Sequence, residues 1–74
     1  MVFVLLQTDV GAAAAVALAA LGVEGVLVAD DVTGPYDVVV QAATAAVLTG
    51  LQAIPGVTRT LTLTPASTGS ARAA

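Results

Sequence analysis

The sequence contains neither cysteine nor histidine. A disulfide framework, a zinc site of Cys and His ligands, a cysteine nucleophile and a histidine base are therefore excluded. Cations are almost as scarce, because Arg59 and Arg72 are the only two and the formal net charge is −3. A chain with two arginines has no basic face for nucleic acid. We therefore expect no direct binding to nucleic acid.

Charge of either sign is rare, and apolar residues take its place. Only 9% of the 74 residues are charged, 58% are hydrophobic and the mean hydropathy is +1.01. The length corresponds to one small domain. A domain this small and this apolar needs a membrane or another protein chain to cover its surface.

The membrane is the weaker of these two possibilities. A spanning helix needs about 18–20 apolar residues in a row. The longest candidate run, 10–23, lies between Asp9 and Glu24 and consists largely of alanine and glycine, which barely favour lipid. The N-terminus has no basic segment, and Asp9 interrupts its apolar stretch, so a signal peptide is also disfavoured. We therefore expect a cytoplasmic protein whose excess apolar surface is covered by protein.

Two kinds of segment alternate along the chain. Runs of β-branched and large apolar residues predict strands, and alanine-rich runs predict helices. Thr8 or Asp9 is expected to cap the first helix, and Thr44 the second. Gly34 and Pro35 form the central turn. The expected strands are 2–8, 26–33, 37–42 and 57–64, and the expected helices are 11–21 and 44–53.

This order, βαββαβ, is typical of the ferredoxin-like α+β fold. The handedness of βαβ crossovers places the first and third strands in the centre of a four-stranded antiparallel sheet, with both helices on one face. We expect residues 1–64 to form this single domain. The small, polar residues 65–74 are expected to form a disordered tail.

The predicted central strands are apolar on both faces. Residues 2–6 are all large and apolar, and so are residues 38–40. Helices on one side of a sheet cover only one face, so the other should be polar if it met water. The simplest cover is the sheet of a second copy, and we expect a homo-oligomer built from dimers that pack sheet to sheet. In the first helix, Val16 and Leu18 lie about 200° apart, so one apolar side can face the sheet and the other a neighbouring subunit.

Catalytic patterns are missing. Asp30 and Asp31 are adjacent in a predicted strand, so their carboxylates point to opposite faces and form a poor acid–base or metal pair. The sequence has no glycine-rich phosphate loop and no nucleophile elbow. Serine occurs only as Ser67 and Ser70, in the predicted tail. We expect no enzyme activity, no metal and no cofactor.

Arg59 is the strongest directional polar group in the predicted domain. Its guanidinium fork offers two parallel donors that suit a ligand carboxylate. The alternative is a salt bridge to Asp31 or Glu24 at the rim of the sheet. The sequence leaves both possibilities open.

Two motifs resemble a known family. The segment 32–37, Val-Thr-Gly-Pro-Tyr-Asp, is followed by an apolar strand, and the segment 52–62 reads Gln-Ala-Ile-Pro-Gly-Val-Thr-Arg-Thr-Leu-Thr. Together they resemble the effector-binding domain, or RAM domain, of the Lrp/AsnC transcription regulators. The resemblance covers about residues 2–64.

The resemblance implies a function and a site. It implies sheet-to-sheet dimers (a dimeric α+β barrel), rings of dimers, and small effectors, usually amino acids, bound between dimers. Carried over by position, the effector-binding loop is Gly34, Tyr36 and Asp37, and the facing segment is Thr58, Arg59 and Thr60. Asp37 would accept from an α-ammonium group.

The chain departs from the family pattern in two ways. We expect a stand-alone form without the DNA-binding domain, which co-assembles with full-length Lrp/AsnC regulators in transcriptional control. The second helix is about two turns shorter than usual for the family, although Val47, Leu51 and Ile54 keep an apolar stripe. The alternative function is a purely structural homo-oligomerisation domain. A small enzyme of the dimeric α+β barrel type is disfavoured because histidine is absent.

Overall fold

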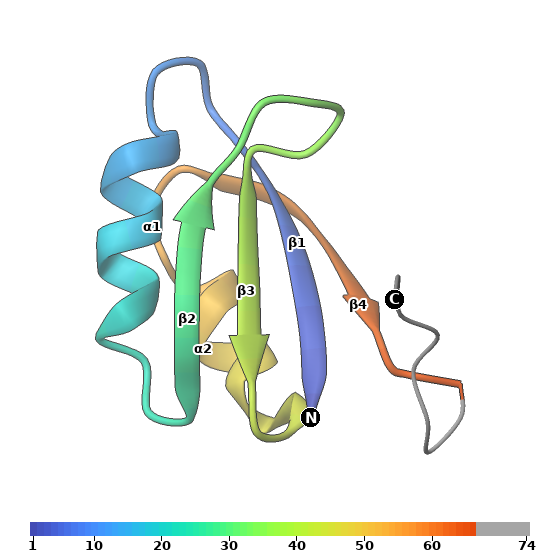
Figure 1. Ribbon diagram of the computed structural model, residues 1–74. Helices are drawn as coiled ribbons and strands as arrows, with labels where there is room; N and C mark the ends of the chain where they lie inside the picture. Colours follow the sequence, from blue (N-terminus) through green and yellow to red (C-terminus); the bar gives the residue numbers. More distant parts are fainter. Residues whose placement is uncertain (67–74) are drawn as a thin grey trace.

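All four predicted strands and both predicted helices form, in the predicted order (Figure 1). The structure is a computed structural model that describes residues 1–66. The elements are β1 (Val2–Thr8), α1 (Ala13–Leu21), β2 (Val26–Asp31), β3 (Val38–Ala42), a 3₁₀ turn η1 (Ala45–Val47) that runs into α2 (Leu48–Gln52), and β4 (Val57–Leu63).

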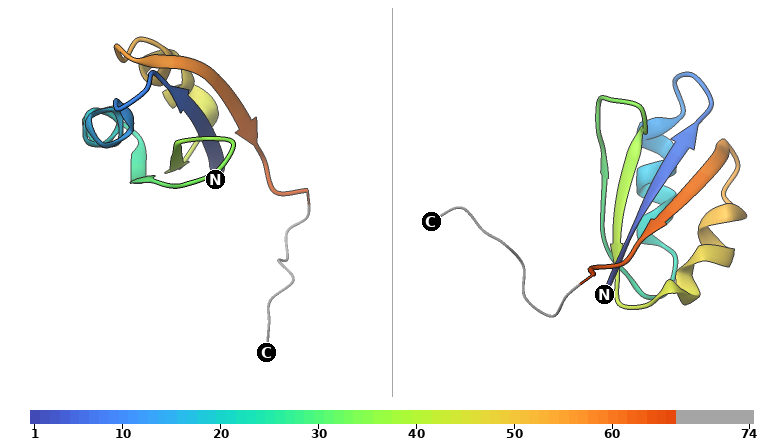
Figure 2. Two further views of the ribbon diagram at one scale, coloured as in Figure 1. Left: turned by 90° about the horizontal axis from the view of Figure 1, so that it is seen from above. Right: turned by 90° about the vertical axis from the view of Figure 1, so that its right-hand side faces the viewer.

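The strands form one antiparallel sheet in the order β2-β3-β1-β4. The central positions of β1 and β3 are as predicted. Both helices lie on the same face of the sheet, as the view from above shows (Figure 2). The chain therefore has the ferredoxin-like α+β fold. Within residues 1–66, no helix is long and apolar enough to cross a membrane.

The core lies between this sheet face and the two helices. Alternate residues of β1 and β3 point into it, because side chains on a strand alternate between faces. In α1, Val16 is 1% exposed and Leu18 is 73% exposed, so the predicted two-sided helix is confirmed. The buried residues are Val2, Val4, Leu6, Val16, Ala17, Ala20, Val38, Val40, Ala42, Val47 and Leu51.

The predicted cap of the first helix is wrong. The helix begins at Ala13 instead of residue 11, and its N-cap residue, Ala12, makes no side-chain capping bond. Thr8 is still part of β1, and the backbone carbonyl of Asp9 accepts from the Ala12 N–H at 3.0 Å. The chain needs a turn through Gly11, at φ +80°, before it can enter the helix. That turn separates both candidate caps from the first helical residue.

The other boundaries differ by small amounts. The cap of the second helix is confirmed, because the Thr44 hydroxyl accepts from the Ala46 N–H at 3.3 Å, but the first turn is 3₁₀ rather than α. The second strand ends at Asp31, the third begins at Val38, and the fourth ends at Leu63. From residue 67 onward, the predicted tail lies outside the described residues.

Two glycines offer a matched test of this packing. Gly56 and Gly11 both have positive φ, at +97° and +80°. A Cβ at residue 56 would lie 3.3 Å from Ala12 Cβ, whereas a Cβ at residue 11 meets nothing within 4 Å. Both alanine variants should be destabilised by about 1–2 kcal/mol because of the left-handed backbone. Gly56→Ala should lose more stability in urea unfolding because it also crowds α1. Equal losses would mean that the turn after α2 is not packed against α1.

Candidate functional site

The face of the sheet away from the helices is uncovered within the chain, and most of its side chains are apolar. We call it the open face. Phe3 and Leu5 of β1 point to it, since Val2, Val4 and Leu6 point to the helices. The register places Leu63 beside Phe3 and Leu61 beside Leu5. Its apolar residues are Phe3, Leu5, Val28, Val39, Leu61 and Leu63.

The edge strand β4 places its leucines on the open face and not under the helices. Thr60 and Thr62 lie opposite the buried Leu6 and Val4, on the helix side. Leu61 and Leu63 lie on the open face and are 42% and 45% exposed. In a sheet with one solvent-exposed face, leucines point toward the helices and threonines toward the solvent. Here the assignment is reversed, so the open face carries the pattern of a contact surface.

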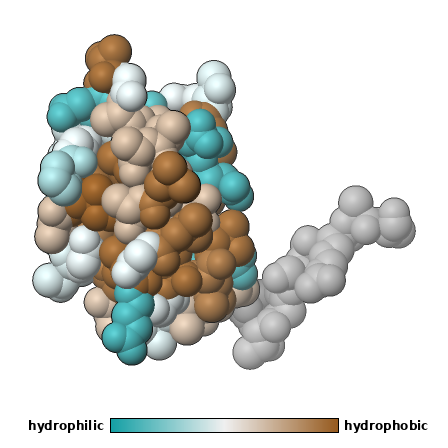
Figure 3. All heavy atoms as spheres, turned by 90° about the vertical axis from the view of Figure 1, so that its left-hand side faces the viewer, coloured by the Kyte–Doolittle hydropathy of each residue, from teal (hydrophilic) through white to brown (hydrophobic). Residues whose placement is uncertain are grey.

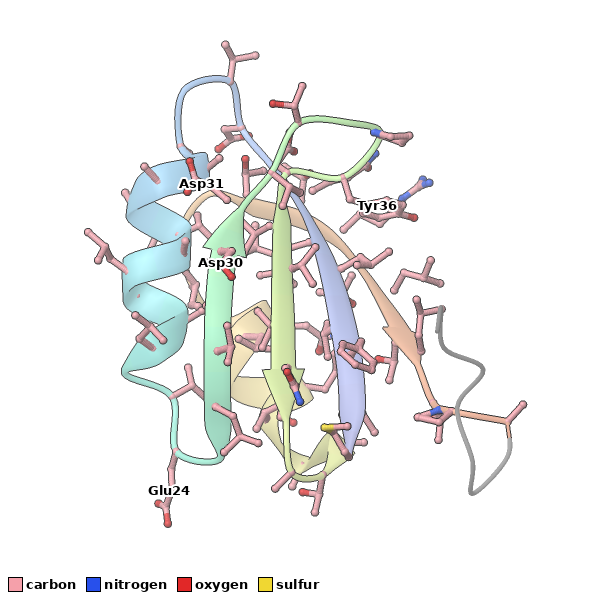
Figure 4. All side chains as sticks on the ribbon, viewed as in Figure 1. Glu24, Asp30, Asp31 and Tyr36 are labelled. Atoms are coloured by element: carbon pink, nitrogen blue, oxygen red, sulfur yellow. The ribbon has the colours of Figure 1, made fainter. Side chains whose placement is uncertain are left out.

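The first half of the predicted site lies in the loop between β2 and β3. Tyr36 and Asp37 are half-buried, whereas Gly34 is exposed. Figure 4 shows Tyr36 at this loop end of the sheet. One carboxylate oxygen of Asp37 accepts from the Thr8 backbone N–H at 2.8 Å, and the Asp37 N–H donates to the Leu6 carbonyl at 2.8 Å. Asp37 thus fixes the loop to the end of β1.

Gln7 connects this loop to the second half of the predicted site. Its side-chain amide donates to the Pro35 carbonyl at 2.9 Å, and its backbone lies opposite Arg59 in the β1–β4 register. The sequence offers one signal for this residue, since Gln7 is the first polar residue after the apolar run of β1. Its role depends on the register and was not predicted.

The second half of the predicted site lines a shallow pocket of about 310 Å³. Thr58, Arg59 and Thr60 contribute from β4, together with Val57 and the side chain of Gln52 at the end of α2. The Gln52 amide donates to the Thr60 hydroxyl at 3.3 Å. Sequence reasoning did not select Gln52 as a site residue. Gly34, Tyr36 and Asp37 do not line this pocket.

The strand order rules out an ion pair between Arg59 and Asp31 or Glu24 within the chain. Arg59 lies on β4 and Asp31 on β2, at opposite edges of the sheet. Three strand spacings of about 4.8 Å separate these edges. Glu24 precedes β2 at the far end of the sheet from the β2–β3 loop (Figure 4). A salt bridge within the chain from Arg59 to Asp31 or Glu24 is therefore wrong.

The two neighbouring aspartates behave as the sequence predicted. Asp30 lies opposite Val39 and Asp31 opposite Val38, so the two carboxylates point to opposite faces, and both are exposed. Among the described residues, no group of three His, Cys, Asp or Glu side chains could hold a metal ion.

The pocket combines one cation with neutral hydrogen-bonding groups. The Arg59 guanidinium can bind a carboxylate through two parallel N–H donors. The hydroxyls of Thr58 and Thr60 and the amide of Gln52 can each donate and accept. Such a set suits a small ligand that carries a carboxylate and a second polar group.

Solved structures of other proteins resemble this chain, among them two from thermophilic organisms. The chain is similar to TTHA0845 from Thermus thermophilus, with a TM-score of 0.75 and 30% identity, over 84% of this chain and 86% of that chain. It is also similar to the hypothetical protein PHS023 from Pyrococcus horikoshii, with a TM-score of 0.68 and 26% identity, over 84% and 83% of the two chains. No protein-family model and no curated protein matches the chain.

The Asp37 contact predicts a specific loss of stability. Asp37→Ala leaves the Thr8 N–H without its carboxylate acceptor and should lower the free energy of unfolding by about 1–2 kcal/mol. Asp37→Asn should lose less, because the amide oxygen can still accept. Asp31→Ala is the matched control, since Asp31 is an exposed aspartate at the end of β2 and lies off the open face. Chemical unfolding of the three variants checks the order, and an unchanged Asp37→Ala would contradict the assigned role.

Proposed function

We propose that this chain is a stand-alone, homo-oligomeric module of the Lrp/AsnC effector-domain type that binds an amino acid. We place it in the cytoplasm, where it co-assembles with full-length Lrp/AsnC regulators and acts as a sensor or co-regulator of transcription. The observation that carries the binding function is the pocket itself. Three residues selected by the resemblance, Thr58, Arg59 and Thr60, line it together.

The pocket supports recognition of the carboxylate of an amino acid. Arg59 is its only charged lining residue. It is exposed, and within the chain it has no carboxylate at Asp31 or Glu24 within reach. Neither of these two carboxylates therefore occupies the Arg59 guanidinium, which can bind the carboxylate of a ligand. Thr60 and the Gln52 amide, which are hydrogen-bonded to each other, supply further polar groups in the lining of the same pocket.

The loop residues fit a role in completing the site after assembly. Gly34, Tyr36 and Asp37 lie at the same end of the sheet as Arg59, and Gln7 links the two segments. They are nevertheless outside the pocket of a single chain. We assign the ammonium-binding part of the site to this loop, approached from a neighbouring subunit. The second oxygen of the Asp37 carboxylate supplies the acceptor.

Ligand binding is tested by thermal stability across the amino acids. A ligand at about 100 times its Kd stabilises a protein by about 2.7 kcal/mol, which raises the Tm of a small domain by several degrees. At least one amino acid should raise the Tm of the wild type, and Arg59→Ala should abolish this shift. The decarboxylated amine of the same amino acid is the ligand control, and Asp31→Ala, at an exposed position off the open face, is the protein control.

Assembly through the open face is tested separately. Leu61→Glu places a charge on the open face, at a position exposed enough in the single chain to leave the fold intact. We expect the variant to lose the sheet-to-sheet contact and to sediment as a smaller species. Val10→Glu is the control, because Val10 is fully exposed in the loop between β1 and α1. A wild-type monomer, or an unchanged mass of Leu61→Glu, would overturn this contact.

A second candidate function is a purely structural oligomerisation domain. One observation favours it, because one carboxylate oxygen of Asp37 is already engaged by the chain's own backbone. If no amino acid shifts the Tm while Leu61→Glu still splits the assembly, this second function holds and the sensing function fails.

A further inference from the structure

The open face carries an acid at one edge. The charged residues of the four strands are Asp30, Asp31 and Arg59. Asp30 lies opposite Val39, which points to the open face because its neighbours in β3 are buried under the helices. Asp31, the next residue of β2, points to the helix side. Among the strand residues, Asp30 is therefore the one acid on the open face, and Figure 4 shows it on the edge strand β2.

The other edge of the open face carries a cation. Arg59 lies opposite Gln7 in the β1–β4 register, and Gln7 shares the open face with Leu5 because strand side chains alternate. β4 and β2 are the two outer strands, and three strand spacings of about 4.8 Å separate them. Arg59 therefore cannot reach Asp30 of its own chain. The open face is apolar in the middle, negative at the β2 edge and positive at the β4 edge.

The two charges lie at a similar height along the strands. One row across the open face consists of Asp30, Val39, Leu5 and Leu61. Arg59 lies two residues before Leu61 in β4, which is about 7 Å along the strand. It therefore belongs to the next row of this face, toward the β2–β3 loop. The carboxylate at one edge and the guanidinium at the other are thus one row apart.

We propose that two copies of this chain pack open face to open face about a two-fold axis parallel to the strands. Asp30 of each copy then forms an ion pair with Arg59 of the other. This inference rests on the sheet-to-sheet contact of the proposed function and adds its axis and its charged pair.

The geometry of packed sheets permits this ion pair. A two-fold axis parallel to the strands exchanges the two edges of the sheet and leaves each row at its own height. The β2 edge of one copy then lies over the β4 edge of the second copy. Packed sheets are about 10 Å apart, a gap that an arginine and an aspartate side chain span together.

The charges distinguish this axis from the alternative. A two-fold axis perpendicular to the strands, between the two faces, places each edge over the same edge of the second copy. Asp30 then shares an edge with a second Asp30, and Arg59 with a second Arg59. Like charges at an interface cost free energy, and a covered charge without a partner loses its hydration. The axis parallel to the strands brings opposite charges together at both edges, so a second copy of this chain complements the open face.

The ion pair also brings the second copy to the candidate site. Arg59 lines the pocket together with Gln52 and Thr60. Asp30 of the second copy therefore approaches a residue of that pocket. A guanidinium has five N–H donors, so Arg59 can bind this carboxylate and a ligand carboxylate at the same time. In this arrangement, each site includes a residue of the other copy.

A further apolar surface stays outside this contact. Figure 3 shows hydrophobic side chains gathered over α1 and β2. Leu18 of α1 is 73% exposed, and α1 lies on the helix side of the sheet. Packing of one open face on another therefore leaves Leu18 uncovered. Leu18→Glu is for this reason the matched control for Leu61→Glu, because both replace an exposed leucine by an acid and only Leu61 lies on the open face.

Exchange of the two charges tests the ion pair. Asp30→Arg and Arg59→Asp should each raise the Kd of the dimer at least about tenfold, because two ion pairs per dimer become like-charge contacts. The double variant Asp30→Arg/Arg59→Asp should recover the wild-type Kd, because it restores opposite charges at both edges. Asp31→Arg is the control, since it makes the same charge change on the helix side of β2. Sedimentation equilibrium measures the four constants. Unchanged single variants, or a double variant that does not recover, would overturn the ion pair.

Failure of the ion pair and failure of the sheet-to-sheet contact give different results. If Leu61→Glu lowers the mass, Leu18→Glu keeps it and the charge variants leave the Kd unchanged, the contact stands and the ion pair is wrong. If the wild type is a monomer, or Leu61→Glu keeps the wild-type mass, the contact itself is wrong and the ion pair falls with it.

The direction of the axis has a test of its own. Val28 and Leu63 are the two ends of another row, with Gln41 and Phe3 between them. The proposed axis places Val28 of one copy over Leu63 of the other, about 10 Å away. The sequence has no cysteine, so Val28→Cys and Leu63→Cys each introduce a single thiol. A bis-maleimide that spans one sheet spacing should crosslink a mixture of the two variants more than either variant alone. If the mixture crosslinks no more than each variant does by itself, the proposed axis is wrong.

Discussion

The structure depends on one constraint, which is that two central strands are apolar on both sides while the helices cover only one. β1 and β3 bury alternate residues beneath α1 and α2, and the residues between them point to the open face. The edge strand β4 follows the same rule, since it turns its leucines away from the helices and its threonines toward them. A single copy therefore buries only one of the two apolar faces of its central strands. The high mean hydropathy of the chain reflects this second apolar face. Within residues 1–66, no helix is long and apolar enough to cross a membrane.

The sequence predicted the fold because its signals are local. β1 is an unbroken apolar run, and the two alanine-rich segments lie between glycines and threonines that end or begin helices. The first helix cap was mispredicted because Thr8 is used by the β1–β4 ladder and hydrogen-bonds to Asp37 through its backbone. A capping motif is read from neighbouring residues, whereas strand pairing joins residues that are distant in the sequence. Here Thr8 pairs within the sheet and does not cap α1. The 3₁₀ start of the second helix also has no distinct local pattern.

The candidate site was predicted in part for the same reason. Thr58, Arg59 and Thr60 are consecutive, so any fold that keeps them in one strand keeps them together, and they do line a pocket. Gln52 reaches that pocket from α2, and Gln7 joins it to the loop only through the sheet register. Neither contact has a sequence spacing that would reveal it. Likewise, the position of Arg59 relative to Asp31 follows from the strand order and not from the sequence distance between them.

The central position of β1 has a consequence for how the chain folds. Val4, near the N-terminus, pairs on one side with Val40 and on the other with Thr62, near the end of the last strand. β1, the first of the four strands in chain order, is thus the last to gain both neighbours. Pairings between such distant residues are slow to form, and an apolar strand is prone to aggregation until it has paired. Folding of the sheet is therefore completed only after β4 has been synthesised, and one edge of β1 stays unpaired until then.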